Sequence, residues 1–156
     1  MKRFCTSTIF VAALVSPVLA DDDDELGAYL YKADCDSLSS AAIVHDLGDL
    51  DSEDDASREW QRLDMGDAPA PHRFWVEDES VKDLKSADFE RAGYAVAIHA
   101  QDSKDADIIA CGDLIGTVPF TADLAEVNNS GFAGRVAVEK HKKGVRFTTG
   151  AFQPMR

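Results

Sequence analysis

The sequence predicts an all-β protein, an antiparallel Greek-key sandwich or flattened barrel of about seven or eight strands with one or two short helices in its loops. Three observations support this prediction. Short apolar or alternating runs recur along the chain between polar segments and glycines. The most regular stretch, Gly93–Gly116, contains two apolar strands joined by a polar loop over 101–107. Near the end of the chain, two alternating segments meet across a short polar loop that ends in Gly144, which is a hairpin signal.

The first half of the chain provides the less regular strands. Residues 25–32 alternate between small or aliphatic side chains and an aromatic face that carries Tyr29 and Tyr31, as expected for a strand. Residues 41–44 form a second candidate strand. The alternation then breaks down, and Ser57–Met65 is predicted to be a short helix or loop over the core that ends at the prolines of 67–71.

The second half begins with a strand at Phe74–Val76, followed by a brief helix. Asp78 or Ser80 is positioned to cap that helix, and apolar residues through Phe89 are spaced to lie near one of its faces. Five further strands follow, and in the fourth Val136 and Val138 are expected to face the core while Ala137 faces outward. These five strands are 94–98, 108–111, Thr117–Phe120, Gly134–Glu139 and Gly144–Thr149.

The N-terminus has the pattern of a secretory signal peptide over 1–20. Lys2 and Arg3 precede the apolar run Ile9–Val15, and small residues place the cleavage site after Ala20. A transmembrane anchor is the competing interpretation, but the apolar run is too short to cross a bilayer. The sequence therefore predicts secretion or export to a periplasm, without membrane insertion.

The rest of the chain is strongly acidic. The whole sequence has 16 basic and 29 acidic residues, and removal of 1–20 leaves 14 basic against 29 acidic residues, a net charge of −15. Such a field repels nucleic acid and anionic lipid, so both are disfavoured as partners. Residues 21–25 form an acidic leader that is expected to be disordered. Residues 26–156 have the length of a single β-sandwich domain.

Two cysteines, Cys35 and Cys111, remain after removal of the signal peptide. An oxidising compartment and an even number of cysteines both favour their pairing. Metal ligation is the competing role, but the two residues lack the close spacing of a zinc site. The sequence thus favours a disulfide between them.

The central stretch combines a strand that ends in a histidine with a strand that contains a cysteine. Residues 94–100 read Tyr-Ala-Val-Ala-Ile-His-Ala, and residues 109–116 read Ile-Ala-Cys-Gly-Asp-Leu-Ile-Gly. This order resembles the last strand pair of copper-zinc superoxide dismutases, in which a valine-rich strand ends in a copper-ligating histidine and a Leu-Ala-Cys-Gly segment provides half of an intrasheet disulfide. The resemblance implies that His99 occupies a ligand position and that Cys35 is the other half-cystine of Cys111.

The C-terminal segment is similar to the same family, in a different order. Residues 129–138 read Asn-Ser-Gly-Phe-Ala-Gly-Arg-Val-Ala-Val and precede Gly-Val-Arg-Phe at 144–147. They resemble the hairpin that opens the dismutase chain and the Ser-Gly-x-x-Gly hairpin of chordin-type CHRD domains. The resemblance implies a circularly permuted, dismutase-like sandwich, and termini that lie close together would permit such a permutation.

The resemblance also implies that most metal ligands are missing. The dismutase strand that supplies a His-x-His pair aligns with Tyr29-Leu30-Tyr31, and phenols are protonated at neutral pH. The substrate-guiding arginine of the family aligns with Ile108. Only His99 matches a ligand position, and one imidazole does not hold a transition metal against competing ligands.

His99 therefore has two interpretations, a remnant metal ligand or a structural histidine at a strand end, and the second is favoured. His45 is a further metal candidate if the fold brings it within bonding distance of His99 or His72. The sequence contains no Gly-x-Ser-x-Gly elbow and no phosphate loop, so no enzyme class is indicated.

The resulting prediction is an exported, non-catalytic, dismutase-like or CHRD-like β-sandwich without a cofactor. It is expected to have a binding or structural role in the cell envelope or the extracellular space, with an unidentified protein or small ligand as its partner. The alternative is a copper- or zinc-binding metalloprotein that uses His99 together with other histidines and has weak dismutase-type activity or none.

Overall fold

The computed structural model describes residues 25–52, 62–63, 74–91 and 93–153. They form eight strands and two 3₁₀ turns. The predicted signal peptide, most of the leader and His72 lie outside them. No helical segment in the described ranges has the length and apolar character needed to span a bilayer. In chain order the elements are β1 (Leu26–Tyr31), η1 (Cys35–Ser40), β2 (Ile43–Ser52), β3 (Phe74–Val81), η2 (Ser86–Phe89), β4 (Ala95–His99), β5 (Ile108–Asp113), β6 (Phe120–Glu126), β7 (Ala133–His141) and β8 (Gly144–Phe152).

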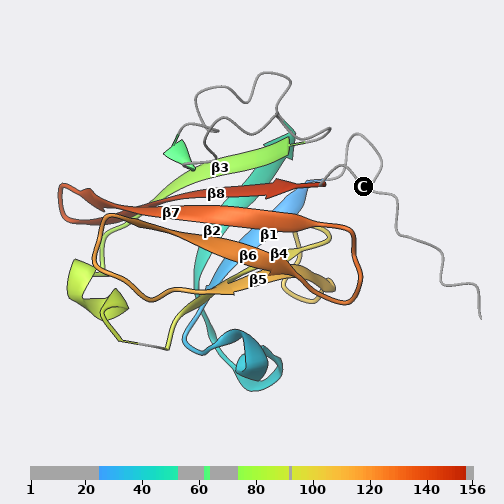
Figure 1. Cartoon of the computed structure of the whole chain (residues 1–156), viewed down its shortest axis with the longest axis horizontal. Coiled ribbons are helices and arrows are strands. Elements are labelled where there is room, and N and C mark those ends of the chain that lie inside the picture. Colours follow the sequence, from blue (N-terminus) through green and yellow to red (C-terminus); the bar gives the residue numbers. More distant parts are fainter. Residues whose placement is uncertain (1–24, 53–61, 64–73, 92, 154–156) are drawn as a thin grey trace, which may run out of the picture.

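The eight described strands form one closed antiparallel barrel with the order β1-β2-β3-β8-β7-β6-β5-β4, in which β4 pairs with β1 (Figure 1). Strands β1 to β3 are successive neighbours, and the chain then returns from β3 to β4 on the other side of β1. The resulting order β4-β1-β2-β3 is that of a Greek key. The structure thus confirms an antiparallel all-β fold of the predicted class.

The interior of the barrel is filled by apolar side chains from all eight strands. Val136 and Val138 of β7 face this interior as predicted. Phe89 of η2 packs into the same cluster, with its ring centroid 5.5 Å from that of Tyr94 and 6.0 Å from that of Phe147. Phe89 and Phe147 are fully buried, so this aromatic group contributes to the hydrophobic stabilisation of the barrel.

Strand β2 is longer than the sequence predicted. Only 41–44 was expected to be extended, whereas β2 continues to Ser52 through an acidic region. Leu47 and Leu50 within it are both buried in the barrel interior, although they are three residues apart. Two inward-facing residues at that spacing require an irregularity in the strand.

A β-bulge provides that irregularity. In the ladder with β1, Tyr29 pairs with Asp46 and Gly27 pairs with Asp49, so β2 carries one extra residue in this interval. Gly48 lies there with a φ of 95°, a conformation that side chains other than glycine rarely adopt. The bulge shifts the phase of alternation, so the period-two pattern of the sequence indicated too short a strand.

The helix predicted after Phe74–Val76 is largely wrong. Strand β3 extends to Val81, so Asp78 and Ser80 pair with β8 instead of capping a helix. Only Ser86–Phe89 forms a 3₁₀ turn. Pairing with β8 satisfies the backbone along the whole of β3, and this tertiary contact outweighs the local capping signal.

The strand predicted at Thr117–Phe120 is also wrong. The peptide bond between Val118 and Pro119 is cis, and β6 begins at Phe120 and continues to Glu126. Leu124 of β6 is buried in the barrel interior, with Phe120 and Ala122 packed against it. Thr121 and Asp123 between them face solvent, so the first part of β6 has the apolar–polar alternation of a strand with one face in water.

The C-terminal hairpin is confirmed, since β7 and β8 pair over their full lengths and His141 lies opposite Gly144. Of the predicted segment Ser57–Met65, only Arg62 and Leu63 lie within the described residues. Leu63 is buried against Val76 and Ala137, which agrees with a segment lying over the sheet. Ala137 faces away from the barrel interior as predicted, and the same contact buries it.

Candidate functional site

A second buried cluster lies on the outer face of β1, β4 and β5, opposite to the barrel interior. Strands β1 and β4 are consequently buried on both faces, unlike strands with one face in water. The turn η1 covers this face, because Leu38 packs into the cluster. We call this group the outer cluster; its members are Tyr29, Tyr31, Leu38, Ala95, Ala97, His99 and Cys111.

A disulfide between Cys35 and Cys111 fastens η1 to the outer face of β5. The two residues are 76 positions apart in the sequence, and their Cα atoms are 6.0 Å apart. The backbone N–H of Cys35 also donates a hydrogen bond to Asp113 Oδ1 at 2.7 Å. The disulfide predicted from the sequence is therefore present. It holds η1 in place over the outer cluster.

His99 lies at the end of β4, where its imidazole is buried between the two tyrosines of β1. The ring of Tyr29 meets it edge-on, with a centroid distance of 4.8 Å. The hydroxyl of Tyr31 lies 2.9 Å from His99 Nε2. Ala95 and Ala97 face the tyrosines across the β1–β4 ladder, and their small side chains leave room for the two rings.

The hydrogen bonds of His99 define its tautomer. Nδ1 lies 3.1 Å from the carbonyl oxygen of Ser103, and a carbonyl only accepts, so Nδ1 carries the proton. Nε2 is then the acceptor and receives the hydroxyl proton of Tyr31. Burial lowers the pKa of His99, although the backbone hydrogen bonds oppose this effect. The imidazole is thus neutral, with both nitrogens occupied.

The two phenols are also held in their neutral forms. Burial raises the pKa of Tyr31. Burial raises the pKa of Tyr29 as well, and Asp102 adds to the shift because Tyr29 donates a hydrogen bond to its Oδ1 at 3.0 Å. Neither phenol is a phenolate at neutral pH, so neither replaces a histidine as a metal ligand under those conditions.

A carboxyl pair adjoins Tyr29 on the solvent side. Asp49 is coupled electrostatically to Asp102, and the pKa of Asp49 is raised to about 6. Burial is the main cause, followed by the hydrogen bond to Asp102 and by the charges of Asp102, Glu25 and Asp46. Gly27 lies opposite Asp49 in the β1–β2 ladder, and a Cβ there would come within 2.8 Å of the Tyr29 ring. A glycine at this position therefore makes room for Tyr29.

The structure places the predicted metal candidates apart. His99 is on β4, whereas half-buried His45 is on β2 opposite Leu30, and no described hydrogen bond or ring contact joins the two histidines. Within the ranges that the structure covers, no three His, Cys, Asp or Glu side chains are grouped to hold a metal ion. The assignment of His99 and His45 to a metal site remains a prediction.

The outer cluster is suited chemically to packing and hydrogen bonding. Its histidine offers no free nitrogen lone pair, and its phenols are donors to His99 and Asp102. Sequence reasoning identified Tyr29, Tyr31 and His99 separately but did not bring them together. The alternation of aromatic residues in β1 was the available signal, and only the β1–β4 pairing shows which histidine the tyrosines meet.

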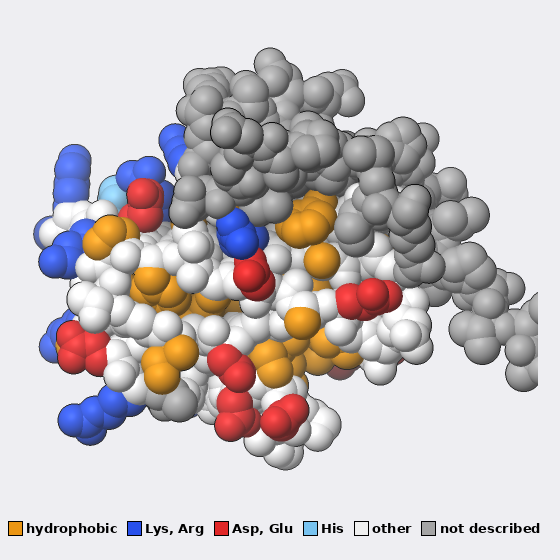
Figure 2. Space-filling view, viewed as in Figure 1, with side chains coloured by type: hydrophobic (Ala, Val, Ile, Leu, Met, Phe, Trp, Pro, Cys, Tyr) orange, Lys and Arg blue, Asp and Glu red, His pale blue; other side chains and the backbone are white. Residues whose placement is uncertain are grey.

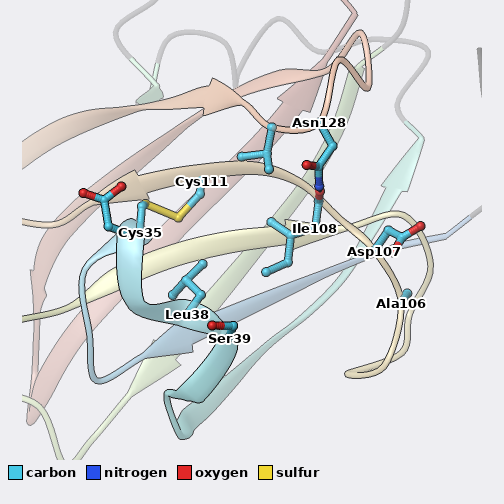
Figure 3. A pocket seen from close by; sticks show the side chains of 10 residues that line it. Cys35, Leu38, Ser39, Ala106, Asp107, Ile108, Cys111 and Asn128 are labelled. Carbon is cyan, nitrogen blue, oxygen red and sulfur yellow. A yellow bond between two sulfur atoms is a disulfide. The ribbon is translucent and has the colours of Figure 1, made fainter.

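An open hollow lies beside the disulfide, between η1, the β4–β5 loop and the residues that follow β6 (Figure 3). Its volume is about 540 Å³. Cys35, Cys111 and Leu38 are among the residues that line it. The other lining residues are Asp36, Ser39, Ala106, Asp107, Ile108, Val127 and Asn128. Sequence reasoning gave no indication of this hollow, because its walls come from three separate segments.

No protein-family model, curated protein or solved structure matches this chain. The resemblance to dismutases and CHRD domains therefore rests on the sequence segments 94–100, 109–116 and 129–147, and it remains a prediction.

Proposed function

We propose that the protein is an exported, non-catalytic β-barrel of dismutase-like or CHRD-like type, with a binding or structural role in the cell envelope or the extracellular space. The observation that carries this proposal is the hydrogen bonding of His99. Its two ring nitrogens are engaged by the Tyr31 hydroxyl and the Ser103 carbonyl. A histidine held in this way stabilises the fold and has no lone pair to offer a metal.

The arrangement around His99 supports the dismutase-like part of the proposal. Tyr29 and Tyr31, which align with the His-x-His pair of that family, both contact the histidine at the matching ligand position. Cys111, on the neighbouring strand β5, forms its disulfide with the segment that follows β1. A dismutase-like fold in which tyrosines have replaced the His-x-His metal ligands would have these features.

The positions of the first and last strands support the circular permutation. Leu26 at the start of β1 pairs with Leu50 near the end of β2, and Phe74 at the start of β3 pairs with Phe152 at the end of β8. Because β2 and β3 are paired near these same residues, the barrel's chain ends lie at one end of the molecule. Such a placement is compatible with a permuted connection.

The proposal is tested by titrating the purified mature protein with Cu²⁺ and with Zn²⁺ in a calorimeter. We expect no stoichiometric binding tighter than about 1 μM, and no difference between the parent and His99→Ala. We also expect no superoxide dismutation above that of free copper. Sequencing of the exported protein should give an N-terminus at Asp21, in accord with signal cleavage.

A matched variant makes the metal test sharper. Tyr31→Phe removes the hydroxyl that engages His99 Nε2 and leaves the ring in place. Under the proposal this variant still binds no metal, because a single imidazole is insufficient. Binding of one copper or zinc ion per chain that is lost in His99→Ala would instead establish the metalloprotein alternative, with His45 as the next ligand to test.

A further inference from the structure

Two buried polar atoms of the barrel have no hydrogen-bond partner in the described part of the chain. They are Nε1 of Trp75 on β3 and Oγ1 of Thr149 on β8, and both residues are 1% exposed. Charged side chains are spread over the outer surface of the barrel, where water surrounds them (Figure 2), whereas these two atoms are shielded from bulk solvent. A buried donor or hydroxyl without a partner costs free energy, so such groups normally bind a protein atom or an ordered water.

The register of β3 and β8 places the two residues on the same face of the sheet as neighbours. Trp75 pairs with Ala151 and Glu77 pairs with Thr149, and the ladder has no register shift between these pairs. Trp75 and Ala151 belong to the cluster in the barrel interior, so the alternation of a strand directs Glu77 and Thr149 to the same side. Thr149 is thus a diagonal neighbour of Trp75, at a separation that an aromatic side chain can span.

Glu77 lies directly opposite Thr149, where the wall of the barrel is incompletely paired. In the described residues, the ladder between β2 and β3 contains two residue pairs, both near the end of β2. The next residue of β3 is Glu77, which is half-buried. A Cβ on Gly48 of β2 would lie 2.9 Å from the Cγ of Glu77, so the glutamate side chain packs against the bulge of β2. Its carboxylate is therefore the acceptor nearest in the ladder to the Thr149 hydroxyl.

We propose that ordered water is bound inside the barrel, between Thr149 Oγ1, Trp75 Nε1 and the carboxylate of Glu77. The indole nitrogen only donates and a carboxylate only accepts, so a species that bridges them must both accept and donate hydrogen bonds. A metal cation cannot accept such a bond, and a halide ion cannot donate one. Water does both, is small enough for a closely packed interior, and finds here the three partners that are usual for a buried water.

The proposal is tested by high-resolution crystal structures of the mature protein and of two threonine variants. In the parent, we expect a water within about 3.2 Å of both Thr149 Oγ1 and Trp75 Nε1. Thr149→Val replaces the hydroxyl by a methyl group, and the water should be lost. Thr148→Val is the matched control: Thr148 is also fully buried on β8, but its hydroxyl donates to Asp78. The water should remain in this variant.

A measurement in solution makes the test independent of crystals. In the parent, water should give cross-peaks of opposite sign in NOE and ROE spectra with the indole proton of Trp75, which is the signature of a water that tumbles with the protein. These cross-peaks should be lost in Thr149→Val and unchanged in Thr148→Val. Because the chain has a second tryptophan, Trp60, the variant Trp75→Phe identifies the indole signal.

Two outcomes would overturn the proposal. One is a parent structure in which Thr149 Oγ1 and Trp75 Nε1 contact protein atoms only, and the other is a water that persists in Thr149→Val. Neither outcome bears on the proposed function, because His99 lies in the outer cluster and the metal titration does not depend on the barrel interior. The two proposals can therefore fail separately.

Discussion

The two clusters on opposite faces of β1 and β4 are held together by different means. Inside the barrel, aliphatic and aromatic side chains from all eight described strands fill the space, and the closed sheet shields them from solvent. On the outer face, Tyr29, Tyr31 and His99 are held by directional hydrogen bonds and are covered by η1, which one disulfide attaches to β5. The interior is thus stabilised by many packing contacts, whereas the outer cluster is stabilised by a few hydrogen bonds and one disulfide.

This difference has a consequence for stability. Removing a side chain from the interior leaves a cavity that surrounding residues fill only in part. Removing one link from the outer cluster frees η1 or leaves a polar atom unpaired, with the barrel itself intact. The first kind of change should destabilise the whole fold, and the second should act mainly on the outer face.

The largest effect is expected for Phe147→Ala. Phe147 is fully buried and packs edge-on against Phe89, so truncation should lower the free energy of unfolding by about 3–5 kcal/mol in urea denaturation. Ile115→Ala is the control, because Ile115 is 58% exposed and its loss should change stability by less than about 0.5 kcal/mol. Similar losses for both variants would show that the interior is not the main source of stability.

A smaller effect is expected when the disulfide is removed. Cys35→Ala/Cys111→Ala should lower the free energy of unfolding by about 2–4 kcal/mol. Hydrogen exchange should accelerate in η1 and on the β4–β5 side, while β3, β7 and β8 keep their protection. The reduced parent is the control and should behave like the double variant. A uniform increase in the rate of amide hydrogen exchange over the whole barrel would mean that η1 and the barrel unfold as one cooperative unit.

Loss of the Tyr31 hydroxyl tests the hydrogen-bond chain. Tyr31→Phe should cost about 1–3 kcal/mol, because it leaves His99 Nε2 buried without a donor. Tyr94→Phe is a matched control: Tyr94 is equally a buried tyrosine, and its ring contact with Lys32 survives the change. If the two variants were equally stable, the bond between Tyr31 and His99 would contribute nothing.

The smallest effect is a pH dependence that involves Asp49. Its pKa in the folded protein is about 6, raised from 3.8, so the folded state binds the proton more tightly than the unfolded state. The stability contributed by this proton is present below pH 4 and is lost as the pH rises to about 6.

Asp49→Asn should therefore gain stability relative to the parent over this pH range, by on the order of 1 kcal/mol after allowance for solvent screening. Asp83→Asn, which removes one carboxylate at an exposed position, is the control for the change in net charge. Urea denaturation at a series of pH values measures both. A parent and an Asp49→Asn variant with parallel stability profiles would show that the carboxyl pair is not coupled to folding.

The sequence predicted the regular strands well where one period held throughout. Tyr94–Ile98 and the alternating residues of β7 lie where expected, because their patterns are not interrupted. The extent of β2 could not be predicted in this way, since Gly48 shifts the inward-facing set by one residue. Strand β6 was predicted three residues too early, at 117–120, although Phe120, Ala122 and Leu124 alternate with exposed Thr121 and Asp123.

Individual residues of the candidate site were predictable from the sequence, but their arrangement was not. Compartment and cysteine count predicted the disulfide, and the resemblance singled out His99 and the aligned tyrosines. The hollow was not predictable, because it forms where η1, the β4–β5 loop and the turn after β6 come together. No local sequence pattern indicates that these segments are neighbours.

By itself, the sequence determined that this chain forms an antiparallel β structure with a Cys35–Cys111 bridge, because alternation and cysteine pairing are properties of local order and composition. The tertiary structure alone decided that Tyr31 engages His99 and that Asp36 and Asp107 border one hollow. The contact between Tyr31 and His99 depends on closure of the barrel through β1 and β4, which pairs residues up to 72 positions apart. Side-chain partners across such distances are set by the register of the strands and not by the residues near them in the chain.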